Sequence, residues 1–213
     1  MKNKLSVIVL LLTCKIALSA SFNCELAKTS VEKMICLSNN LSILDKDMAA
    51  RYSSLTKIYT DSKAIRSWQR NWLRERNYCK DIECLDDSYK QRISLLQSAL
   101  STDSLTKKWT GQYYRYVDNK KDTNTSEILL IAVNNSKVYI DGSAIWIGNI
   151  KTGNVNVGQL QGIGEVKGSV LSEKVEGELC SAKITLTANN ILLVDGESGC
   201  GGMNVTFNGE YRK

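Results

Sequence analysis

The 213-residue sequence predicts an α+β protein, in which a disulfide-stapled antiparallel helical module precedes an antiparallel β-barrel or sandwich of about eight strands. In the first half, apolar residues recur at steps of three and four, which is the spacing of one helix face. Beyond Lys108 apolar and polar residues alternate, and glycine becomes frequent. This change indicates short strands separated by turns.

Residues 1–20 have the features of a secretory signal peptide. Two lysines precede the apolar run 5–12, and the small residues that follow allow cleavage after Ser19 or Ala20. The run is too short to cross a bilayer as a helix. The residues before Cys14 match a lipoprotein box only loosely, so no lipid anchor is expected there. We therefore expect a periplasmic protein with no transmembrane segment.

Composition limits the function in two ways. The chain contains no histidine, which is the usual base of a serine or cysteine triad and the usual nitrogen ligand of zinc. Without residues 1–20 it has 25 basic and 22 acidic residues, and this net charge of about +3 is too small to indicate nucleic-acid binding. We expect no enzyme activity, metal site, cofactor or nucleic-acid partner.

Charge also divides the mature chain. Residues 21–108 carry about +4, whereas residues 109–213 carry about −1. Together with the change in periodicity, this difference predicts a helical domain over 21–100, a linker over 101–108 and a β domain over 109–213. We expect the two domains to fold separately.

Six cysteines remain after removal of the signal peptide. An even number in an oxidising compartment predicts disulfides rather than metal ligands. Six cysteines permit 15 pairings. Sequence proximity favours Cys24 with Cys36, Cys79 with Cys84, and Cys180 with Cys200.

The helical half begins with a capping signal. Thr29 and Glu32 have the spacing of a capping box at the start of a short helix. Three longer helices follow, with inward-facing apolar residues over Leu41 to Tyr59, Ile65 to Leu73 and Leu85 to Leu100. The aromatic residues on these inward positions are predicted to be core rather than a ligand platform: Tyr52, Trp68, Trp72 and Tyr89.

The β half contains about eight candidate strands, at 111–117, 127–134, 136–141, 144–149, 155–161, 182–188, 191–195 and 203–211. Glycines between and within these segments are interpreted as turns or bulges. The pair Asp141-Gly142 in particular is a hairpin-turn signal.

Several stretches of the helical half occur in the order of a known family. Its opening is 21–36, from Ser21-Phe22-Asn23-Cys24 to Ile35-Cys36, and the second helix starts with Leu41-Ser42-Ile43-Leu44-Asp45. Residues 69–79 have the form Gln-x-x-Trp-Leu-x-x-Arg-Asn-x-Cys, followed by Cys84-Leu85 and a helix with Tyr89 and Ile93. Over about 75 residues the chain thus resembles the N-terminal domain of the LprI-type lysozyme inhibitor family.

The resemblance implies a small disulfide-bonded helical module of exported bacterial proteins, some of which inhibit lysozyme. The β half is similar to the barrels of other periplasmic lysozyme inhibitors in architecture only, and a fold alone does not assign a function. We expect an envelope protein that binds and inhibits a lysozyme-type cell-wall hydrolase. The alternatives are an immunity protein that neutralises a toxin delivered to the periplasm, and a structural envelope module that touches peptidoglycan.

The first candidate binding segment is the loop from Glu197 to Met203. Lysozymes act through two carboxyl groups in a cleft, which the hydroxyl of Ser198 could occupy. Gly199 and Gly201 would allow close backbone approach, and a disulfide at Cys200 would keep the loop rigid. The alternative is a tight hairpin with a purely structural disulfide. Because common host lysozymes are strongly basic, the β half is the better candidate surface.

Two further candidates lie elsewhere in the sequence. One is the segment Asp141-Gly142-Ser143-Ala144, together with Trp146. Arg70 and Arg74 share one helix face, which could bind an acidic partner or peptidoglycan and which is otherwise a solvated face. Arg74 or Arg76 could instead brace the helices by pairing with Asp45 or Asp86.

Overall fold

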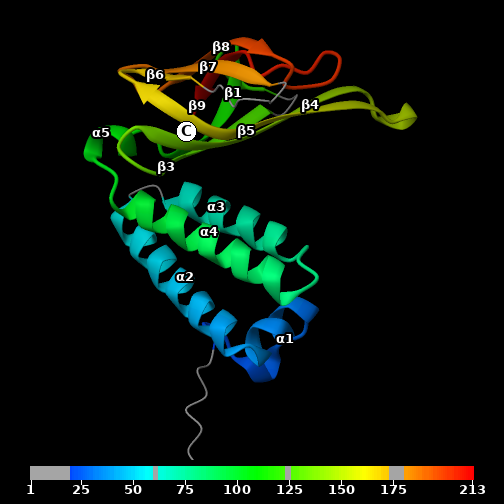
Figure 1. Ribbon diagram of the computed structural model, residues 1–213. Coiled ribbons are helices and arrows are strands. Elements are labelled where there is room, and N and C mark those ends of the chain that lie inside the picture. Colours follow the sequence, from blue (N-terminus) through cyan, green and yellow to red (C-terminus); the bar gives the residue numbers. More distant parts are fainter. Residues whose placement is uncertain (1–19, 60–61, 123–125, 173–179) are drawn as a thin grey trace, which may run out of the picture.

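The computed structural model describes residues 20–59, 62–122, 126–172 and 180–213. The helices form a module below a closed antiparallel β-barrel (Figure 1), so the predicted α+β class is confirmed. Residues 1–19 of the predicted signal peptide, Cys14 among them, lie outside the described residues. Among the helices that are described, none has the length and hydropathy of a membrane span.

The helical module is formed largely as the periodicity predicts. Its elements are η1 (Cys24–Leu26), α1 (Ser30–Leu37), α2 (Asn39–Ile58), α3 (Ser62–Arg76), α4 (Ile82–Leu100) and α5 (Ser104–Lys107). The predicted capping box is present, because Thr29 Oγ1 accepts from the amide of Glu32 at 3.1 Å and Glu32 Oε2 accepts from the amide of Thr29 at 2.9 Å. The short helix α5 lies within the segment 101–108 that was predicted as a linker.

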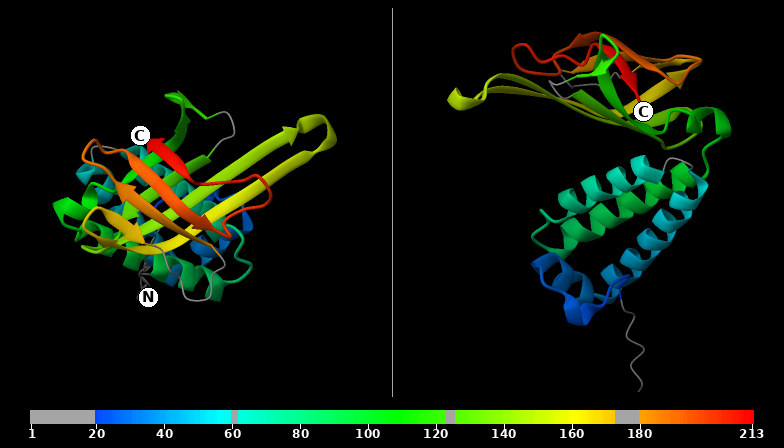
Figure 2. Two further views of the ribbon diagram at one scale, coloured as in Figure 1. Left: turned by 90° about the horizontal axis from the view of Figure 1, so that it is seen from above. Right: turned by 180° about the vertical axis from the view of Figure 1, so that it is seen from behind.

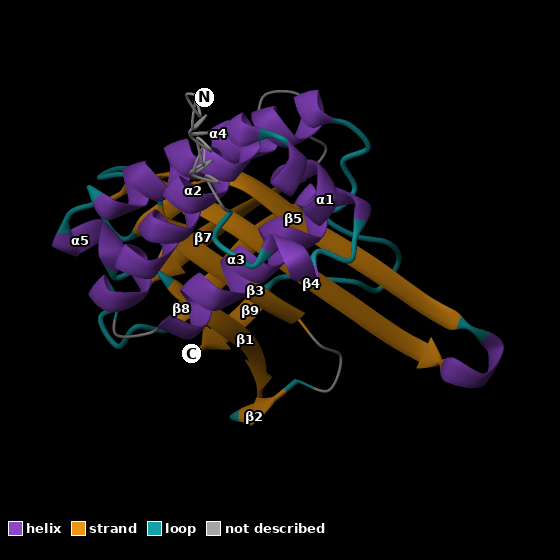
Figure 3. Ribbon diagram, turned by 90° about the horizontal axis from the view of Figure 1, so that it is seen from below, coloured by secondary structure: helices purple, strands orange, loops and turns teal. Residues whose placement is uncertain are grey.

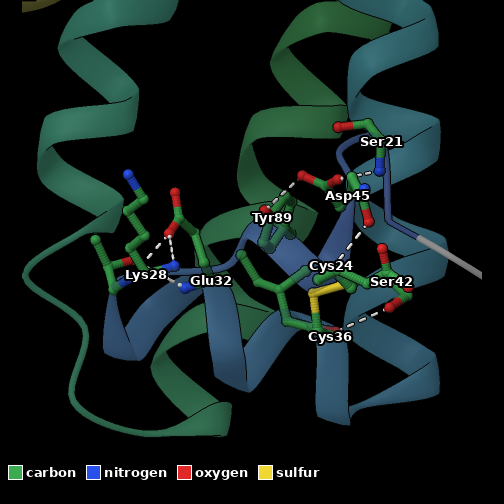
Figure 4. Close-up of a disulfide and its surroundings, with 12 residues drawn as sticks. Ser21, Cys24, Lys28, Glu32, Cys36, Ser42, Asp45 and Tyr89 are labelled. Carbon is green, nitrogen blue, oxygen red and sulfur yellow. Dashed lines mark hydrogen bonds between the residues drawn. A yellow bond between two sulfur atoms is a disulfide. The ribbon is translucent and has the colours of Figure 1, made fainter.

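Three local disulfides are present, with the pairing that sequence proximity favours. Cys24–Cys36 ties η1 to α1, as Figure 4 shows. Cys79–Cys84 closes the turn between α3 and α4. Cys180–Cys200 joins the segment before β7 (Ser181–Leu186) to the loop after β8 (Leu192–Ser198).

A buried polar network holds α2, α3 and α4 together. Asp45 is only 2% exposed and accepts hydrogen bonds from the hydroxyl of Tyr89 at 2.8 Å and the amide of Ser21 at 2.6 Å (Figure 4). Arg76 donates to the same hydroxyl at 2.9 Å. Arg76 therefore connects α3 to Asp45 indirectly, through the hydroxyl of Tyr89. Asp86, the other predicted partner, instead binds Asn40 and Lys90.

The predicted aromatic core is confirmed for three of its four members. Trp68, Trp72 and Tyr89 are buried, whereas Tyr52 is half-buried. Arg92 is also buried, and its guanidinium lies 3.7 Å from the ring centroid of Trp68. These positions carry no exposed aromatic platform.

The remaining strands of the sheet are β1 (Gly111–Val117), β2 (Lys120–Lys121), β3 (Ser126–Ala132), β4 (Lys137–Asn149), β5 (Asn154–Lys167), β6 (Val170–Ser172) and β9 (Gly209–Arg212), with η2 (Ile150–Thr152) between β4 and β5. Within the described residues, the order β1-β3-β4-β5-β6-β7-β8-β9 closes through pairing of β9 with β1. The two-residue β2 extends one end of β1.

The interpretation of Asp141-Gly142 as a turn was wrong. The segments predicted as 136–141 and 144–149 form one strand, β4, which pairs with β5 over most of its length. Gly142 is buried in the barrel wall, where an added Cβ would lie 3.0 Å from the ring of Phe207. Gly142 therefore reflects close packing rather than a turn, since glycine inside a strand often marks a place where neighbouring groups approach the backbone closely.

The strand predicted at 155–161 is also longer, since β5 continues through Gly162 and Gly164 to Lys167. The short strands β2 and β6 were not predicted. In contrast, the segment predicted at 203–211 is a strand only over β9, and residues 204–208 form a loop.

β3 contributes to two hydrophobic cores, one inside the barrel and one among the helices. Ile128 and Leu130 face the barrel interior, whereas Leu129, Ile131 and Val133 pack among the helices. The aromatic rings of Trp68 on α3 and Tyr139 on β4 extend this contact, with centroids 5.7 Å apart. β3 therefore contributes to both domains, and the expectation that the two domains fold separately stays a prediction.

One hairpin projects beyond the rest of the barrel. The outer halves of β4 and β5, joined by η2, extend past both the other strands and the helices (Figures 2 and 3). We call residues 145–157 the overhang.

Candidate functional site

The outer face of the β4–β5 hairpin runs from beneath the helical module into solvent. Cross-strand pairs along this face change in character with position. From Asp141 outwards the first two pairs are polar, and those along the overhang are apolar. In order they are Asp141 with Gln161, Ser143 with Gln159, Ile145 with Val157, and Ile147 with Val155.

A polar cleft of about 860 Å³ lies where α3 crosses this face. Arg70 and Arg74 of α3 line it, together with Ser143 of β4, so the structure brings three predicted binding residues to one site. Glu127 of β3 and Glu75 of α3 also contribute to the wall. The volume falls within the range of about 300 to 1,000 Å³ that is common for small-molecule sites.

Two chains of hydrogen bonds cross the cleft from helix to barrel. In the first, Arg74 donates to Asn71 at 2.7 Å, and Asn71 donates to Asp141 at 2.7 Å. Gln161 donates to the other oxygen of Asp141 at 3.2 Å. The carboxylate of Asp141 is thus held in place by side chains from both domains.

The second chain begins at Arg70, which donates to Ser67 at 2.9 Å. Ser67 donates to Gln112 at 2.8 Å, and Gln112 donates to Glu127 at 3.1 Å. Neither Arg70 nor Arg74 forms an ion pair with a described residue. Each guanidinium therefore keeps donor groups that no described side chain uses.

Glu75 is the carboxyl group of the cleft that has no hydrogen bond or ion pair to the described part of the chain. Partial desolvation at the cleft wall raises its pKa above the usual value, and the negative charge of Asp141 adds to this effect. Arg92 and Arg74 act in the opposite direction. The neutral form of Glu75 is therefore favoured relative to that of an ordinary exposed glutamate.

The glycine loop predicted as a binding segment lies beside the cleft. A second cavity, of about 520 Å³, is lined by Gly199, Gly201, Ser143 and Gln159. Since Ser143 and Gln159 line both cavities, the two are contiguous. Ser198 is exposed at the end of β8 and lines neither cavity among those described.

The loop glycines serve packing inside the protein. Gly201 pairs with Gly158 in a β-bridge, and Cys200 accepts from the amide of Gln159 at 2.8 Å. An added Cβ at Gly201 would lie 2.7 Å from Val205, and one at Gly158 would lie 2.7 Å from the carbonyl oxygen of Cys200. The loop is therefore fixed to β5, at the base of the overhang.

The overhang carries exposed apolar side chains. Ile145 is 36% exposed, Ile147 38%, Val155 42% and Val157 66%. From Ala144 to Gln161 the single charged residue is Lys151, at the tip of the hairpin.

Asn71, Glu75, Gln159 and Gln161 were not predicted as site residues, whereas Asp141 belongs to the predicted candidate segment 141–144. Once β4 and β5 are known to be continuous, alternation along the strands places Asp141, Gln159 and Gln161 on the outer face with Ser143. The contribution of α3 depends on tertiary packing and has no comparable local signal.

In the described part of the chain, no cluster of cysteine, aspartate and glutamate side chains is arranged to hold a metal ion. Comparisons with protein-family models, curated proteins and solved structures gave no match for the chain. The resemblance of the helical half to the LprI-type family therefore rests on its residues alone.

Proposed function

We propose that this chain is an exported envelope protein that binds and blocks a lysozyme-type cell-wall hydrolase, and that the overhang enters the substrate cleft of the enzyme. The observation that carries the proposal is a narrow, projecting hairpin with four exposed aliphatic side chains and one charge. Exposed apolar clusters of this kind are typical of protein-binding surfaces. The LprI-type resemblance supports the choice of enzyme.

Charge complementarity supports the same occupant. Lysozyme-type enzymes hold two carboxyl groups in an elongated cleft. The tip of the overhang presents the ammonium of Lys151 and no carboxylate between Ala144 and Gln161. An inserted cation with flanking aliphatic contacts would pair with the catalytic carboxylates and exclude water and substrate. The glycine loop at the base of the overhang would contact the rim of the cleft.

The test is a turbidity assay in which c-, g- and i-type lysozymes clear cell-wall suspensions with and without the oxidised mature protein. Titration calorimetry measures the stoichiometry. The proposal expects one-to-one inhibition of at least one type. No binding to any of the three enzymes would overturn the lysozyme assignment and leave the immunity and structural alternatives.

Variants separate the overhang from the rest of the surface. We expect Lys151→Glu to weaken inhibition by at least about tenfold, which corresponds to 1.4 kcal/mol. Its matched control is Lys167→Glu, because Lys167 is exposed at the far end of β5 and the change in net charge is the same. Equal loss of inhibition in both variants would argue against insertion of the overhang.

A further inference from the structure

The polar cleft between α3 and the barrel is concave, unlike the projecting overhang, and inhibition of a hydrolase by the overhang does not use it. We propose that this cleft binds a peptidoglycan fragment, an N-acetylated disaccharide carrying a short peptide. The proposal is independent of hydrolase inhibition and relies only on the export predicted from residues 1–20.

The first support is unused hydrogen-bonding capacity. The side chains of Glu75, Ser143, Gln159 and Tyr78 line the cleft or its continuation and make no side-chain hydrogen bond to a described residue. A hydroxyl, an amide and a carboxyl group offer donors and acceptors together. Sugar hydroxyls also both donate and accept, so a glycan could satisfy this mixed set, whereas a purely apolar ligand would leave it unpaired.

The second support is the presence of both charge signs. Arg70 and Arg74 lie one helical turn apart on α3, and neither guanidinium has an ion-pair partner in the described residues. Guanidinium groups bind carboxylates through paired, charge-assisted hydrogen bonds. They are suited to the carboxylates of a peptide stem, while Glu75 is available for an amino group or for sugar hydroxyls.

The third support is preorganisation. Asn71, Asp141 and Gln161 are fixed by hydrogen bonds between α3, β4 and β5, so the cleft wall needs little ordering when a ligand binds. Tyr78, in the turn that follows α3, is 78% exposed and supplies an aromatic ring at the rim. The cleft therefore combines rigid polar walls with an accessible aromatic face.

The experiment is titration calorimetry of the oxidised mature protein with three probes: a disaccharide-tetrapeptide, the N-acetylated glycan without peptide, and the free tetrapeptide. We expect the disaccharide-tetrapeptide to bind most tightly, because both its parts contact the cleft. The proposal would be overturned by failure of this probe to bind at millimolar concentration, or by equally tight binding of the free tetrapeptide.

The decisive variants lie on one helix. Arg70→Ala with Arg74→Ala should weaken binding of the disaccharide-tetrapeptide by at least about tenfold and leave the weaker glycan binding less affected. Arg66→Ala is the matched control, because Arg66 is exposed on the same helix, bonds only to Ser62 among the described residues and does not line the cleft. Equal affinity of the double variant and the control would refute the site. Lys151→Glu should bind the fragment normally, which distinguishes this site from the overhang.

Discussion

Adjacent residues on β3 provide a test of whether the two domains unfold as one unit. Leu130 and Ile131 are both fully buried, but Leu130 faces the barrel interior and Ile131 packs among the helices. Replacement of either by alanine removes three carbon atoms, at about 0.8 kcal/mol each. With the cavity that remains, we expect each substitution to lower the free energy of unfolding by about 3 to 4 kcal/mol.

Hydrogen exchange followed by mass spectrometry reports each domain separately, through peptides from α2 and from β7–β8. Because β3 belongs to both cores, either substitution should accelerate exchange of the most protected amides in both domains. The expected acceleration is about two to three orders of magnitude, since 1.4 kcal/mol corresponds to a factor of ten. If Leu130→Ala accelerated exchange in the barrel and left α2 fully protected, the two domains would not be coupled and the reasoning would fail.

Three further predictions concern stability. Thr29→Ala removes the capping interaction at α1 and should cost about 1 kcal/mol in urea denaturation. Chain entropy predicts that loss of the Cys180–Cys200 bridge, with a sequence separation of 20, costs about 3.3 kcal/mol, against about 2.1 kcal/mol for Cys79–Cys84, with a separation of 5. Paired serine substitutions, compared by thermal denaturation, should show this order, and the reverse order would contradict it. Finally, burial raises the pKa of four tyrosines: Tyr59, Tyr89, Tyr139 and Tyr211. That of Tyr211 rises to about 12, so between about pH 10 and 12 the unfolded chain loses protons that the folded chain keeps, and stability falls as pH increases. Burial also lowers the pKa of Arg92 to about 9, and this shift makes the free energy of unfolding rise with pH. Because it is one group and the buried tyrosines are four, we expect the tyrosines to determine the sign of the change. Urea denaturation followed by circular dichroism should show a lower free energy of unfolding as the pH rises from about 10 to 12, and an unchanged or higher free energy of unfolding over this range would contradict the prediction.

Features that depend on neighbouring residues could be predicted from the sequence. The capping box of Thr29 requires only residues within one turn, and the three disulfides each close a short segment. The helical spacing correctly placed Trp68 and Trp72 in the core because both lie on the inward face of α3. These predictions succeed where local geometry and burial act in the same direction.

The full length of the β4–β5 hairpin was missed because a local signal conflicted with tertiary structure. Asp141-Gly142 favours a turn in isolation, but pairing with β5 and packing against Phe207 keep the chain extended there. The uninterrupted apolar run from Ile128 to Val133 carried a further signal, since a strand buried on both faces needs a second layer against it. This run indicates that helices cover the barrel at β3.

The candidate site could not be located from the sequence because its two walls come from segments far apart in the chain. Asn71 and Asp141 are separated by 70 residues and yet share a hydrogen bond of 2.7 Å. The composition of either segment alone indicates only a solvated helix face and an ordinary strand. Contact between them depends on the way the helical module packs on β3.

Beyond Tyr139, which packs against Trp68 of α3, the outer face of the hairpin departs from the usual relation between cover and polarity. At the cleft the cross-strand pairs Asp141–Gln161 and Ser143–Gln159 are polar, and along the overhang, in solvent, the pairs are aliphatic. Folding alone favours the opposite arrangement, because aliphatic groups gain free energy from burial and polar groups lose hydration. A hairpin kept in this order is consistent with two binding surfaces, a covered polar cleft for a small hydrophilic ligand and an exposed aliphatic edge for a protein. Exchange of the aliphatic residues for polar ones should therefore improve the solubility of the isolated protein and abolish the proposed inhibition of a hydrolase, and a variant that still inhibits would show that these side chains do not contact the enzyme.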